Sequence, residues 1–334
     1  MKEIVSLAHG SGGSLTRQLI EDVFLKNYGN EKLNQLQDSS LLQINQNSLA
    51  FTTDSFVVKP YFFPNTDIGH LSICGTINDL SVSFAQPLAI SASFIIEEGF
   101  PLEDLKRIAN SMKQTLEFAA VQLITGDTKV VSAGEADKIF ITTSGIGIVS
   151  EHLKNNTPLQ PGDSIILNGN IGDHGIAVLS AREELPINSP IISDSTPLNR
   201  LIFPLLQTFP RTVKFMRDVT RGGLATVLNE VVNRNTGIEI FEEEIPVSRP
   251  VGSICELLGM DPLYLANEGK AIFIVKEEIA EKFLALMKKG GLGKNGAIIG
   301  RITDSNPGRV VLRTRIGGKR IIAPLVSDQL PRIC

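Results

Sequence analysis

The sequence of 334 residues contains no tryptophan, three cysteines and four histidines. Cys74, Cys255 and Cys334 stand far apart, and none belongs to a C-x-x-C pair. A disulfide framework or a zinc site therefore has no pattern to build on, and the scattered histidines argue against a histidine-rich metal site. Cys74 and Cys255 lie among apolar neighbours, where we expect small core residues. This cysteine usage favours a reducing compartment, the cytoplasm.

Long runs of apolar or basic residues are also missing. The apolar segments, such as "PLAISASFII", are too short to span a bilayer, so no membrane contact is expected. The N-terminus carries Glu3 and then glycines, which is not the pattern of a signal peptide. The formal net charge of −4, without a basic run, argues against nucleic acid as a partner.

The residues that are present describe a globular chain. A composition of 42% hydrophobic and 20% charged residues is typical of such proteins, and the length suffices for two domains. Apolar periodicity predicts strands over 41–44, 48–58, 87–98, 121–131 and 138–150. It predicts helices over 14–28, 67–85 and 101–119. Because strands and helices mix without strict alternation, the pattern indicates an α+β fold rather than a doubly wound sheet.

The segment "NNTPLQPGD" is rich in proline, glycine and asparagine, as domain boundaries often are. We therefore predict an N-terminal domain over 1–155 and a C-terminal α+β domain over 156–316. Periodicity is lost from about Gly317, so residues 317–334 are predicted to form a flexible tail. Further strands and helices are predicted in the C-terminal domain over 164–169, 173–184, 221–235, 271–275, 277–289, 297–302 and 309–314.

Aspartates recur beside small residues where predicted elements end, at Asp38, Asp54, Asp79 and Asp127. Carboxylates that meet at such ends would bind Mg²⁺, a hard cation that usually also holds the phosphates of a nucleotide. The alternative is that each aspartate only caps a helix or makes a turn, which is the commoner role for any single one. Four of them in the first half of the chain favour the metal site.

Glycines supply a second element of a nucleotide site. "HGSGGS" over 9–14 opens a predicted helix, and "MRDVTRGGLA" places Gly222 and Gly223 at the start of another. Backbone N–H groups at helix N-termini attract phosphate oxygens, and Arg221 could add a bidentate charge. Lys129 and Glu268 stand out as charges between apolar strands, although solvated surface residues would give the same pattern.

The sequence ends in "DQLPRIC", with Cys334 as its last residue. A terminal thiol can arise by chance, because chain ends are usually unimportant. An extended tail spans about 3.3–3.6 Å per residue. Pro331 would restrict the freedom of the last residues.

Taken together, these segments resemble the HypE family of carbamoyl dehydratases, which act in [NiFe]-hydrogenase maturation. The resemblance runs from residue 9 to residue 334, and the "PRIC" terminus is specific to that family. Motifs such as "TGDT" are also similar to the wider superfamily of aminoimidazole ribonucleotide synthetase, selenophosphate synthetase and thiamine-phosphate kinase. Two positions depart from the superfamily pattern: "QDSSLL" stands where Asp-Ala-Ala is commoner, and Phe84 stands where glycine is usual. The matching segments are "HGSGG", "TTDSFVVKPYFFP", "DIGHLSICGTINDL", "TGDTKVV", "GDSIILNGNIGDHGIAV", "MRDVTRGGLA", "NEGK" and "DQLPRIC".

The resemblance implies a two-domain PurM-like architecture whose N-terminal domain binds ATP and Mg²⁺ and forms a homodimer. Apolar strands such as "PLAISASFII" are consistent with a covered face. Members of the family receive a carbamoyl group on the C-terminal cysteine from the carbamoyltransferase HypF. They use ATP to convert the thiocarboxamide to a thiocyanate, and the cyanide passes to iron on a HypC–HypD scaffold.

By the same resemblance, Cys334 is the carrier, Glu268 is the base, and Lys129 steadies charge on the oxygen or the transferred phosphoryl group. The implied metal ligands are Asp38, Asp54, Asp79 and Asp127. The implied nucleotide-binding residues are Gly10, Gly12, Gly13, Asp54, Asp79, Asp127, Thr128, Asp218, Arg221, Gly222 and Gly223.

Two other functions remain open at this stage. Another superfamily reaction, such as selenophosphate synthesis, would need a cysteine or selenocysteine near the N-terminal glycine loop, whereas the first cysteine here is Cys74. A non-enzymatic scaffold would use Cys334 only as a tether or a metal ligand. Consumption of ATP that depends on magnesium would separate an enzyme from a scaffold.

Overall fold

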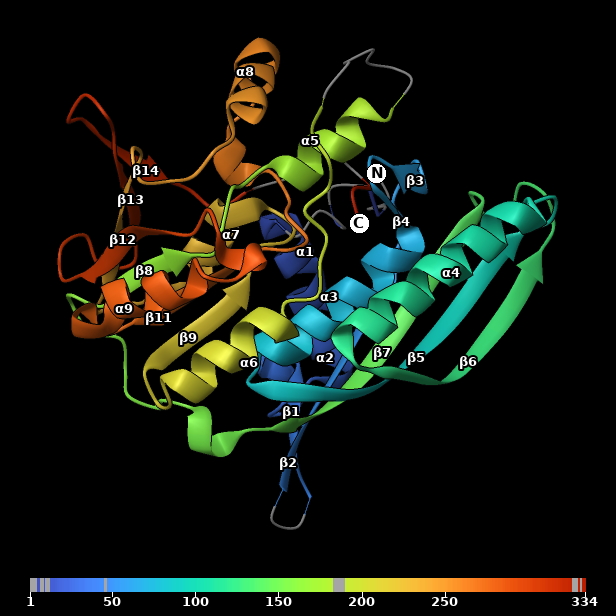
Figure 1. Cartoon of the computed structure of the whole chain (residues 1–334), viewed down its shortest axis with the longest axis horizontal. Helices are drawn as coiled ribbons and strands as arrows, with labels where there is room; N and C mark the ends of the chain where they lie inside the picture. The colour runs from blue at the N-terminus through green and yellow to red at the C-terminus, as the bar shows by residue number, and fades with distance from the viewer. Residues whose placement is uncertain are drawn as a thin grey trace.

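A computed structural model describes residues 5–6, 9, 13–44, 47–182, 190–325, 330 and 332–334. Two sheets, each covered by helices, lie side by side (Figure 1). One sheet is built from the first half of the chain and the other from the second half. The predicted α+β class is confirmed. Within the described ranges, no helix has both the length and the apolar character that a membrane span requires.

The first sheet has five strands in the order β1-β2-β7-β5-β6. Only β5 and β6 run parallel; the other neighbours are antiparallel. The strands predicted in this half are confirmed. Their bounds are β1 (Ser40–Ile44), β2 (Asn47–Phe56), β5 (Ala85–Glu97), β6 (Gln122–Val131) and β7 (Ile139–Val149).

Helix α3 (Ile68–Val82) lies directly on the first sheet, and α4 (Leu102–Ala119) packs against it (Figure 1). Asp67 caps α3, since its Oδ1 accepts from the N–H groups of Gly69 at 2.8 Å and His70 at 3.1 Å. The helix approaches the sheet closely at Gly75, where a Cβ atom would lie 2.9 Å from the Phe56 ring. A larger residue here would have to displace the Phe56 ring, so Gly75 allows the close approach of the helix to β2.

The chain reverses after α3 at Phe84, where the superfamily usually has glycine. Phe84 has a φ of 61°, in the left-handed region that favours glycine. The unusual residue therefore keeps the turn that glycine would make.

The second sheet has seven strands in the order β14-β13-β10-β12-β8-β11-β9. Its central strands are buried on both faces, since Ile272 and Ile274 of β11 belong to one core cluster and Phe273 to another. The strands are β8 (Ser164–Leu167), β9 (Val213–Asp218), β10 (Gly237–Phe241), β11 (Ala271–Val275), β12 (Ala297–Thr303), β13 (Val310–Arg313) and β14 (Lys319–Ile322). The helices of this half are α5 (Asp173–Ser180), α6 (Asn199–Thr208), α7 (Gly223–Val231), α8 (Arg249–Leu258) and α9 (Glu277–Met287).

The two halves meet along α3, which contacts both α6 and β9. The shorter elements near the start of the chain and around this junction are α1 (Ser14–Leu19), α2 (Lys26–Tyr28), β3 (Phe62–Phe63) and β4 (Thr66–Asp67). Elements of both halves therefore contribute side chains to the space between β2, α3 and β9.

The end of the chain returns to the first half. Regular structure continues to Ile322, because β14 pairs with β13 beyond Gly317, where the irregular tail was expected to start. Arg332, Ile333 and Cys334 then lie near β3 and β4 (Figure 1), and the Ile333 side chain is buried. Pro331 lies outside the described residues.

Candidate active site

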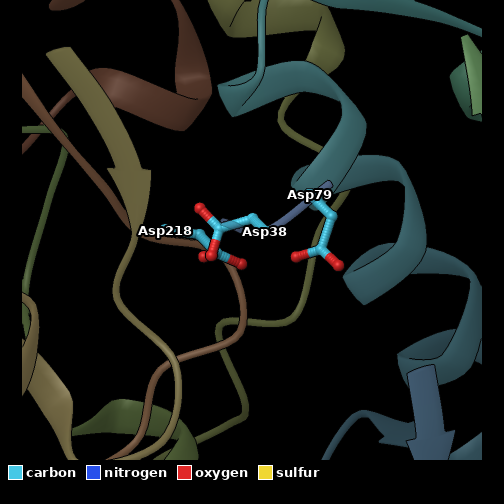
Figure 2. Close-up of side chains that lie close together, drawn as sticks. All are labelled: Asp38, Asp79 and Asp218. Atoms are coloured by element: carbon cyan, nitrogen blue, oxygen red, sulfur yellow. The ribbon is translucent and has the colours of Figure 1, made fainter. Parts of the chain in front are cut away.

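Three aspartates from three separate segments converge where the two halves meet. Asp38 precedes β1, Asp79 lies on α3, and Asp218 ends β9. Each offers a carboxylate oxygen, and these three oxygens lie within 4.8 Å of one another (Figure 2). The structure thus joins Asp38 and Asp79, both predicted as metal ligands, with Asp218, which had been assigned to the nucleotide.

Without a cation, burial and the repulsion between like charges raise the free energy of the ionised carboxylates in this cluster. Burial raises the pKa of Asp79 well above its ordinary value, and the charges of Asp218, Asp38 and Asp54 raise it further. Burial likewise raises the pKa of Asp218, and the charge of Asp38 adds to it. Oxygen donors of this number and sign fit a hard divalent cation such as Mg²⁺. Asp38, Asp79 and Asp218 therefore fit the Mg²⁺ that the sequence implies.

Arg217 is a site residue that the sequence reasoning missed. One of its terminal nitrogens lies 2.8 Å from Asp38 Oδ1, and the other lies 3.0 Å from Glu230 Oε2. Burial raises the pKa of the Asp38 carboxyl, whereas the charge of Arg217 lowers it. Arg217 therefore partly balances the cluster. Its place directly before Asp218 was the only signal in the sequence.

The loop before α7 brings Arg221 to the same region. Its Nη2 atom lies 3.7 Å from Oδ1 of Asp54, which extends from β2. Gly222 is the N-cap of α7 with a φ of 74°, and a Cβ atom there would lie 2.2 Å from Thr226 Oγ1. The predicted glycine turn at the start of this helix is thus required by the geometry, and it sets the direction in which Arg221 leaves the loop.

Glu268 is buried in the same interior, with 3% of its surface exposed. Burial raises its pKa well above the ordinary value, and the charges of Asp54, Asp218 and Asp194 contribute further. Its backbone is held by Asp194 Oδ1, which accepts from the Glu268 N–H at 3.0 Å, and by Asn78 Nδ2, which donates to its carbonyl at 3.2 Å. Among the described residues, Oε1 of Glu268 has no hydrogen-bond partner. The backbone of Glu268 is thus held by two side chains, whereas Oε1 of its carboxyl group is not engaged by a described residue.

Cys334 lies in this electrostatic environment. The pKa of the Arg221 guanidinium is raised above its ordinary range, first by the charge of Cys334 and then by Asp54 and Glu268, against the opposing effect of burial. Cys334 is partly buried, whereas Cys74 and Cys255 are buried in the core as predicted. The last residue and the proposed base therefore lie close enough to influence one cation.

Other predicted residues lie elsewhere within the single chain. Asp127, Thr128 and Lys129 are on β6, the outer strand of the first sheet, and Lys129 Nζ pairs with Asp127 Oδ2 at 2.9 Å. Both side chains are largely exposed. Gly13 is the N-cap of the short helix α1. Gly10 and Gly12 lie outside the described residues.

Replacing Asp79 tests the metal assignment. Because the folded state raises the pKa of Asp79, its charge destabilises the metal-free protein near neutral pH, and Asp79→Asn should not lower the melting temperature of that form. The variant should lose the stabilisation that Mg²⁺ gives to the wild type, and turnover of Mg-ATP should fall by at least about a hundredfold. Asp22→Asn, at an exposed helical ion pair, is the control and should keep both properties. An unchanged response of Asp79→Asn to Mg²⁺ would remove Asp79 from the site.

Family models match both halves of the chain. The N-terminal domain of AIR synthase related proteins matches residues 36–149. The C-terminal domain of the same proteins matches residues 160–313. The predicted two-domain PurM-like architecture is confirmed.

Individual relatives cover nearly the whole chain. It is 45% identical to the carbamoyl dehydratase HypE of Bradyrhizobium diazoefficiens over 332 residues, which are 99% of this chain and 96% of that protein. A crystal structure of a HypE–HypF complex contains a chain that is 47% identical, with a TM-score of 0.84 and coverage of 92% of this chain and 99% of that one. A crystal structure of HypE in complex with ATP is 41% identical, with a TM-score of 0.82 and coverage of 99% and 100%. On this similarity in sequence and fold, the chain belongs to the HypE family of carbamoyl dehydratases, which act in hydrogenase maturation.

Proposed function

We propose that this chain uses ATP to dehydrate a carbamoyl group carried on the sulfur of Cys334, converting an S-carboxamide into an S-cyanate that supplies cyanide to the iron of [NiFe] hydrogenase. The observation that carries the proposal is that the charges of Cys334 and Glu268 both raise the pKa of Arg221, while Glu268 is buried and its Oε1 has no hydrogen-bond partner among the described residues. A site for dehydration needs the modified thiol, a base and a phosphate-binding region together.

The chemistry explains why these parts belong together. The carbonyl oxygen of the S-carboxamide is a very poor leaving group, so it must be activated before it can leave. Transfer of the γ-phosphoryl group of ATP to that oxygen, with loss of one N–H proton, gives ADP and an O-phosphorylated imidate. Removal of the remaining N–H proton then forms the nitrile, and the C–O bond breaks to release inorganic phosphate.

Glu268 is assigned to the second proton transfer. A base that works near neutral pH needs a pKa well above that of an ordinary carboxyl group, and burial raises the pKa of Glu268 in this direction. Arg221 is assigned to neutralising charge near Cys334. Because Asp194 and Asn78 hold the Glu268 backbone, the base keeps its position when the tail moves.

Nucleotide binding is assigned to the region around the aspartate cluster. Asp38, Asp79 and Asp218 would hold Mg²⁺, with Asp54 nearby, and the ion when bound would neutralise phosphate charge. The backbone at Gly222 and Gly223 and the glycine-rich segment that includes Gly10, Gly12 and Gly13 would contact the phosphates. The related HypE structure in complex with ATP supports nucleotide binding by this chain.

The partners follow from the carrier role. The related HypE–HypF complex supports HypF as the source of the carbamoyl group, and a HypC–HypD scaffold would receive the cyanide. Both steps need an accessible thiol, so the part of the predicted tail (317–334) that follows β14 must leave the site and return. A reducing cytoplasm would keep the carrier sulfur out of disulfide bonds.

A homodimer through the first sheet completes the proposal, with residues 1–155 as the dimerising domain and 156–316 as the second domain. Strand β6 is an edge strand whose exposed side chains include Ile124 at 63% and Val130 at 67%. An exposed apolar edge of this kind favours pairing with another chain. Asp127 and Lys129 lie apart from the aspartate cluster within one chain. In a dimer, they would contribute to the phosphate-binding site of the second copy.

The dimer can be disrupted at its proposed interface. Ile124→Asp should shift the protein from dimer to monomer in light scattering at micromolar concentration, because a charge would be buried against the partner. Ile316→Asp is the matched control, since Ile316 is 96% exposed in the second half of the chain. A wild-type monomer, or equal dissociation of the two variants, would contradict this interface.

Replacing Cys334 tests the carrier role directly. Cys334→Ala should lose both carbamoylation by HypF and formation of the thiocyanate, because the other two thiols, Cys74 and Cys255, are buried, while its melting temperature and Mg-ATP binding should be retained. Mass spectrometry of the C-terminal peptide after incubation with carbamoyl phosphate, ATP and HypF measures both products. Cys255→Ala should still form both adducts, since Cys255 is buried in the core. Full cyanide donation by Cys334→Ala would refute the proposal.

Replacing Glu268 separates the two chemical stages. Glu268→Gln should accept the carbamoyl group at the normal rate but dehydrate it about 100- to 10,000-fold more slowly, since an amide is not a base. The carboxamide adduct should accumulate in intact-mass spectra. Wild-type dehydration should speed up as the pH rises through the raised pKa of Glu268, and Glu268→Gln should lose this dependence. Glu256→Gln, at an exposed position on α8, is the control; dehydration at the normal rate in Glu268→Gln would exclude Glu268 as the base.

A further inference from the structure

The last residues of the chain are held by backbone hydrogen bonds to the segment that follows β2. The N–H of Val57 donates to the Cys334 O atom at 3.0 Å, and the N–H of Lys59 donates to the carbonyl of Arg332 at 3.1 Å. The alternation of these bonds is that of a short added strand, a common way for a protein to bind a peptide. Such bonds set the register of the terminal segment but do not select its sequence.

The side chain of Arg332 makes contacts that do select sequence. Its Nε atom donates to the carbonyl of Val57 at 2.9 Å, and its Nη1 atom pairs with the Asp137 carboxylate. The guanidinium carbon lies 5.8 Å from the centre of the Phe140 ring. Lysine could replace the charge but could not donate to both oxygens in this planar geometry. The surroundings of Arg332 therefore favour arginine.

Ile333 and its carbonyl are recognised by residues of the second half. The Ile333 side chain is 3% exposed and belongs to a core cluster that includes Ile176 of α5. Nε2 of His174 lies 2.8 Å from the Ile333 carbonyl, and Nδ1 lies 2.9 Å from Ser193 Oγ. Because a carbonyl only accepts, Nε2 must carry the proton and donate. Burial lowers the pKa of His174, which is consistent with a neutral ring in this orientation.

The geometry points to a peptide-binding site, here called the tail site (Val57, Lys59, Asp137, Phe140 and His174), that reads the sequence Arg-Ile-Cys. We propose that this site binds the sequence when a separate chain presents it, and not only when it is tethered in the same chain. All the contacts described above are made within three residues, and Leu330, just before them, is buried in the same core cluster as Ile333. The ligand class is thus a short peptide with a guanidinium, then a β-branched apolar residue, then a small residue.

This inference rests on the proposed function, since it names what would hold the carrier cysteine at the dehydrating site. It also goes beyond that function, because binding of a separate peptide requires no ATP, HypF or turnover. A failure of the peptide experiment would leave the dehydration proposal standing. A failure of cyanide formation would likewise leave peptide recognition intact.

The test first vacates the tail site in the full-length chain. Arg332→Glu places a carboxylate opposite Asp137, so the tethered tail should leave the site. A peptide with the sequence Asp-Gln-Leu-Pro-Arg-Ile-Ser, labelled with fluorescein at its N-terminus, is then titrated and followed by fluorescence anisotropy. We expect saturable binding that is at least about tenfold tighter than to the wild-type chain, where the tethered tail competes.

Matched controls assign the binding to the tail site. Arg320→Glu makes the same charge change on β14, where Arg320 pairs with Asp261, and should bind the peptide as weakly as the wild type. A peptide with glutamate in place of arginine should bind the Arg332→Glu chain at least about tenfold more weakly than the arginine peptide. Equal binding of the two peptides, or no binding of either to folded Arg332→Glu, would overturn the proposal.

A second measurement on chains with the native tail keeps the proposal testable if Arg332→Glu does not fold. Asp137→Asn removes the carboxylate that pairs with Arg332, so the amides of Val57 and Lys59 should exchange with deuterium at least about tenfold faster than in the wild type. Amides of α4 should be unchanged. Equal exchange rates of the Val57 and Lys59 amides in the two proteins would show that Asp137 does not help to bind Arg332.

Discussion

The burial of several like charges at one point is the constraint on which the rest of this structure depends. Asp38, Asp79 and Asp218 bring carboxylate oxygens within 4.8 Å of one another, and each belongs to a different segment of the chain. Such a cluster is stable only with compensating positive charge. Arg217 supplies part of it, and a divalent cation suits the remainder. The meeting of α3 and β9 at the boundary between the two halves therefore brings the carboxylates together as well as contributing to the core.

The terminal segment uses weaker interactions, which suit a part that must leave. Burial of one isoleucine side chain contributes about 1.5–3 kcal/mol, and each hydrogen bond adds about 0.5–1.5 kcal/mol net. Ile333, the backbone bonds to Val57 and Lys59, and the ion pair of Arg332 thus hold the segment in one position. A sum of a few such contacts can be broken at ordinary temperature, as the proposed carrier role requires.

Local patterns predicted much of the secondary structure because periodicity reports which face of a segment is buried. The strands of the first sheet, and α3 and α4, were recognised in this way, as was the start of α7 at its glycine pair. Other elements gave weaker signals. Helix α6 contains Pro204, which argues against a helix in sequence reasoning. Strand β14 is short and only its last residue is buried, so it was read as part of the tail.

The sequence by itself determined the two-domain α+β class and most of the acidic and basic residues of the site, because both follow from local pattern and motif. Only the tertiary structure decided which of them meet. It grouped Asp218 with Asp38 and Asp79, and it left Asp127 and Lys129 on an outer strand. It also added residues that the sequence analysis had not singled out, namely Arg217, Asp194, Asp137 and His174. Their roles arise from contacts between segments far apart in the chain, and such contacts depend on the packing of whole elements, which local periodicity does not encode.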